Sequence, residues 1–234
     1  MTLTTLKLQQ RIARRYQTRT VRLRLDDLEL PFTRIAEPDR VLDEIVALEE
    51  RRRSTPADQH EPPRVPYWAE LWESALGLAQ AIGRVNIAGK SVLDLGCGMG
   101  LAGAAAAAMG ARVLMADIES SALLLARLNT LPWHERVRIR RVNWQLDRLG
   151  EQFDFILGAD ILYESVQWPY LNDFWQTHLT PIGTILLGEP GRQTGDLFPA
   201  WAQQRGWAIE QSTEQIEHDN KTIRIFRARR IKSI

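Results

Sequence analysis

The chain has 234 residues, of which 44% are apolar and 25% charged, as expected for one large globular domain or one domain with an extension. Thirty Lys and Arg residues against 29 Asp and Glu residues leave a formal charge of +1, which argues against binding a polyanion through bulk charge. The single cysteine, Cys97, excludes an intramolecular disulfide and a cysteine-based zinc site, and no apolar run is long enough to span a membrane.

Residues 1–65 are predicted to form an N-terminal extension. Residues 1–17 have a helical pattern, and residues 20–25 and 28–35 alternate as the two strands of a hairpin. Asp39 is expected to cap the next helix. The proline-rich residues 54–66 are expected to be a linker, or a loop that closes over a site.

A basic run lies at the start of this extension. Between residues 7 and 24 the chain has seven Lys and Arg residues and no acid. A solvated basic face explains this simply, while docking to an acidic partner or a mitochondrial presequence are the alternatives. The run has no serine, and no secretory apolar segment is present, so we expect a cytoplasmic protein.

Residues 66–234 are predicted to form a single α/β domain. Five apolar strands alternate with helical segments, and they lie at residues 91–95, 112–116, 137–142, 153–157 and 183–188. Two late strands are joined by a connection too short for a helix, so they should pair antiparallel. The pattern predicts a doubly wound, Rossmann-like sheet of about seven strands with the last strand antiparallel.

The first strand of this domain leads into a glycine loop. Gly96, Gly98 and Gly100 follow the strand directly, where glycines allow a sharp turn and a close approach to a ligand. Gly98, Gly100 and Gly103 also have the spacing of a dinucleotide fingerprint. The carboxylate of Asp94 would repel a pyrophosphate and attract an ammonium or sulfonium group, so the sequence favours a cationic nucleoside.

Asp117 ends the second strand of the domain. An acid there can accept hydrogen bonds from both ribose hydroxyls of a nucleoside. The alternative is that Asp117 caps the helix that begins near Ser120.

These residues resemble a known family. Asp-Leu-Gly-Cys-Gly-Met-Gly (94–100) together with Asp117 resembles the S-adenosylmethionine (SAM) site of the seven-stranded class I methyltransferases. Residues 153–163, FDFILGADILY, are similar to the Asp-x-x-Tyr segment of protein-lysine methyltransferases acting on chaperones, calmodulin and the electron-transfer flavoprotein β-subunit. Residues 66–72, PYWAELW, most resemble the flavoprotein enzyme.

The resemblance implies SAM as the cofactor. It places Trp72 against SAM, and it places Gly96, Cys97 and Gly98 around the methionine end of the cofactor. Asp117 would hold the ribose, and Trp144 would lie near the adenine. Asn143 would offer an amide contact to the adenine, and Ala159 would contribute backbone to the pocket. The expected cofactor-binding residues are therefore Trp72, Asp94, Gly96, Cys97, Gly98, Gly100, Asp117, Asn143, Trp144 and Ala159. The four histidines have no metal-ligand spacing, and no metal is expected.

SAM carries an activated methyl group, so the protein must mainly align it with a neutral nucleophile and exclude water. Asp160 and Tyr163, just beyond the fourth strand, are expected on the substrate side. Their alternative is a helix cap and a packed ring. Glu70 is a weaker candidate that a solvated acid would also explain.

The combined prediction is a SAM-dependent protein-lysine methyltransferase with a protein substrate. The same chemistry on a small amine or a nucleic acid is one alternative. The nucleic-acid version is disfavoured because Ala-Asp-Ile-Leu-Tyr (159–163) stands where an Asn/Asp-Pro-Pro-aromatic motif is expected. A non-catalytic scaffold and a nicotinamide dehydrogenase are the others, and Asp94 argues against the dehydrogenase.

Overall fold

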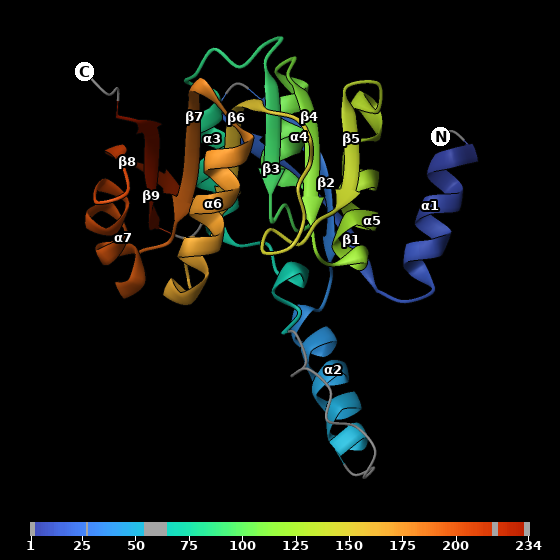
Figure 1. The fold of residues 1–234 in the computed structure, drawn as a ribbon. Helices are drawn as coiled ribbons and strands as arrows, with labels where there is room; N and C mark the ends of the chain where they lie inside the picture. The colour runs from blue at the N-terminus through green and yellow to red at the C-terminus, as the bar shows by residue number, and fades with distance from the viewer. Residues whose placement is uncertain (1–2, 27, 54–64, 217–219, 232–234) are drawn as a thin grey trace.

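A computed structural model describes residues 3–26, 28–53, 65–216 and 220–231 of the chain (Figure 1). A seven-stranded sheet forms its centre, with helices on both faces. Its strands are β3 (Ser91–Leu95), β4 (Arg112–Asp117), β5 (Val137–Arg141), β6 (Phe153–Ala159), β7 (Leu179–Glu189), β8 (Trp207–Ile216) and β9 (Lys221–Arg230). Among the described residues, no helix is both long and apolar enough to cross a membrane.

The order of the strands is β5-β4-β3-β6-β7-β9-β8. The neighbours from β5 to β7 pair in parallel, whereas β9 pairs antiparallel with both β7 and β8. This confirms the predicted Rossmann-like sheet with its last strand antiparallel. The chain leaves β3 toward β4 and β5 and then returns to β6 on the other side of β3, so the sheet has a topological switch point between β3 and β6.

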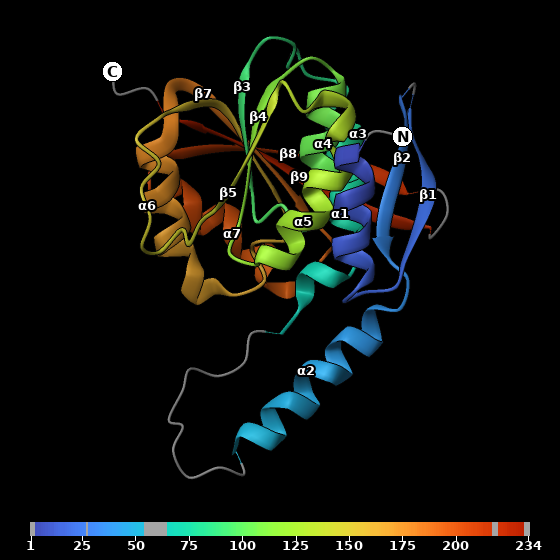
Figure 2. The ribbon, with the colours of Figure 1, turned by 90° about the vertical axis from the view of Figure 1, so that its right-hand side faces the viewer.

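Two layers of helices cover the sheet, as Figure 2 shows with the sheet seen nearly edge-on. One face carries α3 (Glu73–Ile82), α4 (Leu101–Ala108) and α5 (Ser120–Asn129), and the other carries α6 (Trp168–His178) and α7 (Gln193–Gln203). The alanines 104–107 of α4 are all buried. Their small side chains allow α4 to pack closely on both the sheet and its neighbouring helices.

The N-terminal extension consists of α1 (Leu3–Ala13), the hairpin β1 (Thr18–Leu25) and β2 (Leu28–Ile35), and α2 (Pro38–Arg53). Leu8 and Ile12 of α1 are buried in a cluster shared with α4 and α5. Asn129 at the end of α5 accepts a hydrogen bond from the Thr33 N–H (2.8 Å) and donates one to the Thr33 carbonyl (2.9 Å). The amide therefore pairs with β2 much as a neighbouring strand would. The division of the chain at residue 65 stays a prediction.

Several elements begin at different residues from those predicted. The helix α2 begins at Pro38, so Asp39 lies in its first turn and does not cap it. Proline suits this place because its fixed φ is already helical and its missing N–H would have no partner. The strand β7 begins at Leu179, four residues early, and includes Pro181 beside a register shift against β6. A proline is tolerated at such an irregularity.

The glycine at the start of α4 gives a testable prediction. Gly100 has φ +87°, and a Cβ there would lie 2.9 Å from the Ala126 Cβ. We expect Gly100→Ala to lower the free energy of unfolding by about 3 kcal/mol, from backbone strain and overpacking together. Gly150→Ala is the matched control, since Gly150 has φ +73° with nothing within 4 Å and should cost about 1 kcal/mol. Equal losses in urea denaturation would contradict the packing account.

Candidate functional site

A cavity of about 630 Å³ lies at the carboxyl ends of the central strands, at the switch point. Its walls come from the loops after β3, β4, β5 and β6, from the segment before α3 and from Phe32 of β2. All the predicted site residues except Asp94 line it: Glu70, Trp72, Gly96, Cys97, Gly98, Gly100, Asp117, Asn143, Trp144, Ala159, Asp160 and Tyr163.

The glycine loop forms the floor of the cavity. Gly96, Gly98 and Gly100 all have positive φ, at 66°, 53° and 87°, which glycine adopts without steric cost. The Cys97 N–H donates to the Ala116 carbonyl (3.0 Å), and the Gly100 N–H donates to the Cys97 carbonyl (2.8 Å). The loop is therefore tied to β4 and turns directly into α4, whose N-terminal end faces the cavity.

Cys97 contributes to this loop mainly through its backbone. Burial raises the pKa of its thiol well above the usual value, so the thiol stays protonated at neutral pH. A protonated thiol is a poor nucleophile, which fits a structural place in the loop.

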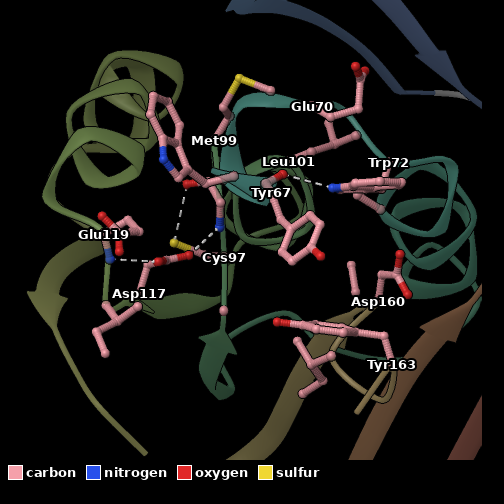
Figure 3. Close-up of a pocket in the computed structure, with 18 of the residues that line it drawn as sticks. Tyr67, Glu70, Trp72, Cys97, Met99, Leu101, Asp117, Glu119, Asp160 and Tyr163 are labelled. Atoms are coloured by element: carbon pink, nitrogen blue, oxygen red, sulfur yellow. Dashed lines mark hydrogen bonds between the residues drawn. The ribbon is translucent and has the colours of Figure 1, made fainter. Parts of the chain in front are cut away.

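Asp117 links the loop to the end of β4. Its Oδ2 accepts a hydrogen bond from the Gly98 N–H and its Oδ1 one from the Glu119 N–H, both at 2.8 Å (Figure 3). The residue is only 8% exposed, and burial raises the pKa of its carboxyl. Each oxygen keeps a lone pair for a ligand in the cavity. The contact with the Glu119 N–H resembles the alternative role of Asp117 as a helix cap, but the N-cap residue of α5 is Glu119.

The structure places Asp94 behind the loop, outside the cavity wall. Its side chain is buried, and its Oδ2 accepts a hydrogen bond from the Gly103 N–H in α4 (2.8 Å). Burial, with a smaller contribution from nearby Asp117, raises the pKa of the Asp94 carboxyl to about 7. Its observed contact thus fixes α4 against β3. The glycine loop lies between Asp94 and the cavity, so the predicted attraction between Asp94 and a cationic ligand would act across this loop without direct contact.

This placement predicts how stability changes with pH. The pKa of Asp94 lies near 7 in the folded chain and about 3.9 when unfolded, so the free energy of unfolding falls as pH rises from about 4 to 7. We expect Asp94→Asn to remove the part of this decline that Asp94 causes, and to gain on the order of 2 kcal/mol at pH 8, because its amide oxygen still accepts the Gly103 N–H. Chemical denaturation at pH 4 to 8 measures it, with exposed Asp173→Asn as the control. An unchanged pH slope in Asp94→Asn would contradict the prediction.

Amide side chains surround the predicted adenine side. The Asn143 Oδ1 accepts a hydrogen bond from the Gln145 N–H (3.0 Å). The Trp144 Nε1–H donates to the Gln167 Oε1 (3.3 Å), which also accepts from the Gln145 side chain (2.7 Å). Gln145 and Gln167 both line the cavity, and the sequence indicated neither of them.

Aromatic rings and the carboxylate of Asp160 form the other side of the cavity, opposite Asp117 and Glu119 (Figure 3). The rings of Tyr67 and Tyr163 meet edge to face, with centroids 5.4 Å apart. The Trp72 Nε1–H donates to the Tyr67 carbonyl (2.8 Å). Burial, with nearby Glu164, raises the pKa of Tyr163 to about 12, so its phenol is neutral at physiological pH.

Asp160 is held by an arginine and does not cap a helix. Its two carboxylate oxygens accept hydrogen bonds from the Arg192 Nε and Nη2 atoms at 2.8 and 2.6 Å. Asp160 also has φ +52°, unusual for a residue with a side chain. Glu70 is only partly exposed: its Oε1 accepts from the Leu71 N–H (2.8 Å) and lies 3.5 Å from the Arg34 guanidinium.

Besides Gln145 and Gln167, the sequence did not indicate three further functional candidates. Glu119 and Tyr67 line the cavity, and Arg192 holds Asp160. Tyr67 lies within residues 66–72, which carry part of the family resemblance, and Glu119 lies only two positions beyond Asp117, so both had a local signal. Arg192 had none, because its partner lies 32 positions away. Within the described ranges, no group of three His, Cys, Asp or Glu side chains is placed to hold a metal.

The sheet order and the cavity at its switch point define the fold of the class I methyltransferases. The glycopeptide N-methyltransferase MtfA, solved with SAM, matches 72% of this chain and 100% of its own with a TM-score of 0.58 at 13% identity. The N-methyltransferase NodS from Bradyrhizobium japonicum, solved with S-adenosylhomocysteine, matches 66% of this chain and 86% of its own (TM-score 0.56, 18% identity). The lysine methyltransferase family model matches residues 67–197, more than half of the chain, and the chain belongs to this family.

Two curated relatives indicate how far the similarity extends. The protein N-lysine methyltransferase METTL21A of Xenopus tropicalis is 35% identical over 130 residues, 51% of this chain and 58% of the relative. The electron transfer flavoprotein beta subunit lysine methyltransferase of Danio rerio is 33% identical over 135 residues, 54% of this chain and 51% of the relative. The chain thus spans just over half the length of these relatives.

Proposed function

We propose that the protein is a SAM-dependent protein-lysine N-methyltransferase. The observation that carries this proposal is the division of one cavity into two unlike sides: the acids Asp117 and Glu119 on one, and the rings of Tyr67 and Tyr163 beside Asp160 on the other. A nucleoside cofactor suits the first side and an alkylamine the second. Family membership and the names of the relatives support the same assignment.

The cavity fits SAM in size and in the chemistry of its walls. Its volume of about 630 Å³ lies within the range of small-molecule sites. Gly96 and Gly98 would let the backbone approach the methionine end closely, Asp117 would accept the ribose hydroxyls, and the Trp144 ring would pack near the adenine. When bound, SAM supplies a methyl group that is already activated for transfer.

On the acceptor side the protein has to bind and orient an amine. In the overall reaction a new N–C bond forms as the methyl S–C bond breaks, giving S-adenosylhomocysteine and a methylammonium that releases its proton to water. The nitrogen must be neutral when it attacks, because a protonated amine has no lone pair. Tyr67 and Tyr163 would pack against the alkyl chain, and Asp160 would accept a hydrogen bond from the amine N–H.

A protein substrate is favoured by exposed apolar side chains on α2 and by the exposed ring of Tyr67 in the cavity wall. The helix α2 projects away from the body of the molecule in Figures 1 and 2. Its Leu42 and Val46 are 37% and 48% exposed, and Tyr67 at the cavity is 47% exposed. Leu42 and Val46 are four positions apart and therefore lie on one face of α2, and an exposed apolar face is typical of protein-binding surfaces. A cytoplasmic location is also part of this proposal.

Labelling of a lysate tests the proposed activity. The pure protein is incubated with methyl-labelled SAM and a lysate from cells that lack it, and the label is counted in protein, nucleic-acid and small-molecule fractions. We expect label in a discrete protein band. Label only in RNA or in small molecules would move the enzyme to another substrate class. No label anywhere, with SAM raising the melting temperature, would favour the scaffold, and stabilisation by NAD in place of SAM would favour a dehydrogenase.

A further inference from the structure

Asp160, which lines the acceptor side of the cavity, forms an ion pair with Arg192. The Asp160 side chain is 5% exposed and the Arg192 side chain 39% exposed. The two hydrogen bonds form a bidentate pair, the strongest geometry for arginine and a carboxylate. The Arg192 guanidinium carbon also lies 5.6 Å from the centre of the Trp72 ring, within the range of a cation–π contact.

A second group of charges fixes Arg192 in this place. The buried carboxylate of Glu189, at the end of β7, accepts hydrogen bonds from the N–H groups of Gly191 (2.9 Å) and Arg192 (2.5 Å). Arg224 of β9 donates to Glu189 (2.6 Å) and to the Arg192 carbonyl (2.8 Å). The backbone that carries Arg192 is thus held to the sheet at both sides, and its side chain is directed at Asp160.

The carboxylates on the acceptor side of the cavity are either paired with an arginine or exposed to water. After β6 lie Asp160, Tyr163 and Glu164, and before α3 lie Tyr67 and Glu70. Asp160 is paired with Arg192 and Glu70 with Arg34, and the Tyr163 phenol is neutral. Glu164 is exposed, so water screens it. Asp117 and Glu119 lie on the opposite side of the cavity.

This pairing of charges matters for a substrate amine, because only the unprotonated amine can attack the methyl group. An unpaired buried carboxylate would hold a lysine as ammonium and raise its pKa, since an opposite charge favours the protonated form. A carboxylate neutralised by arginine still accepts a hydrogen bond but attracts a proton much less.

We propose that Arg192 is a positioning residue that acts through Asp160: by neutralising it, Arg192 keeps the acceptor side uncharged, so that the substrate amine binds as the free base. The inference rests on the proposed lysine methylation. It gives Asp160 the task of orienting the amine and Arg192 the task of preventing the ion pair between Asp160 and the amine.

The test is the pH profile of turnover for four variants, measured as the initial rate of label transfer from methyl-labelled SAM to lysate protein between pH 6.5 and 10. Arg192→Gln should move the profile by at least about one pH unit toward alkaline pH, a roughly tenfold loss near pH 7.5 that is recovered near pH 9.5. Arg192→Lys retains the positive charge and should retain the wild-type profile. The double variant Asp160→Asn/Arg192→Gln restores neutrality and should return the profile toward wild type at a lower rate. Arg205→Gln, at an exposed arginine beyond α7, is the control for loss of one positive charge.

A lower rate with an unchanged pH profile in Arg192→Gln would overturn the inference and leave a purely structural ion pair. A shift of the same size in the double variant would also overturn it, because neutrality would then not be the cause. No label in protein with the wild-type enzyme would overturn both this inference and the proposed function. The melting-temperature increase caused by SAM shows that each variant is folded. If Arg192→Gln does not fold, Arg192→Lys still tests the inference, because a shift of its pH profile toward alkaline pH despite the retained positive charge would overturn it.

Discussion

Replacing Asp117 by alanine is expected to weaken SAM binding by about 100-fold or more. The carboxylate would accept two hydrogen bonds from the ribose, and bonds to a charged acceptor contribute about 1.5 to 3 kcal/mol each. A loss of about 3 kcal/mol corresponds to roughly 100-fold in the dissociation constant. The variant also releases the Gly98 N–H, so the glycine loop loses one of its anchors to β4.

Isothermal titration calorimetry with SAM measures this effect directly. Asp117→Asn keeps the size of the side chain but turns one acceptor into a donor, which would face either the Gly98 or the Glu119 N–H. It should therefore lose affinity as well. Glu135→Ala, at an exposed acid outside the cavity, is the control and should bind as wild type does. A dissociation constant within threefold of wild type for Asp117→Ala would remove Asp117 from the cofactor site.

Asp160→Ala is expected to lower turnover by about 100-fold or more while SAM affinity stays within about threefold. The variant removes the acceptor that orients the amine, and losses of this size are typical when one such polar group is removed from an active site. It also leaves the Arg192 guanidinium without its carboxylate, which adds a repulsive charge beside the amine.

Single-turnover labelling of lysate protein, with SAM affinity measured in parallel, separates binding from turnover. Asp173→Ala is the matched control, because Asp173 is an exposed acid on α6 and does not line the cavity. Turnover near that of wild type would reduce Asp160 to a structural partner of Arg192. Loss of SAM affinity in proportion to turnover would instead assign Asp160 to the cofactor side.

The central sheet could be predicted from the sequence because its signals are local. Val92, Leu93 and Leu95 form an apolar run that ends in glycines, and the helices between the strands require parallel crossovers. The cavity residues in the loops after β3 and β4 followed from the same pattern, since carboxyl ends of parallel strands meet at one edge of a sheet.

What could not be predicted depends on contacts between distant residues. The glycine pattern placed Asp94 at the end of its strand but did not reveal that its side chain turns to Gly103, on the far side of the loop. The pairing of Asp160 with Arg192 could not be predicted, because Arg192 lies beyond the next helix and the next strand. The predicted closing loop, residues 54–66, lies outside the described residues except for its last two positions.

The most direct test of the central claim is to find which atom receives the methyl group. Protein labelled with methyl-labelled SAM is hydrolysed completely, and its amino acids are separated beside methylated standards. The proposal predicts that the label elutes with Nε-methylated lysine, and that Asp160→Ala lowers it. Label eluting with methylated arginine or histidine, or no label in protein at all, would contradict it.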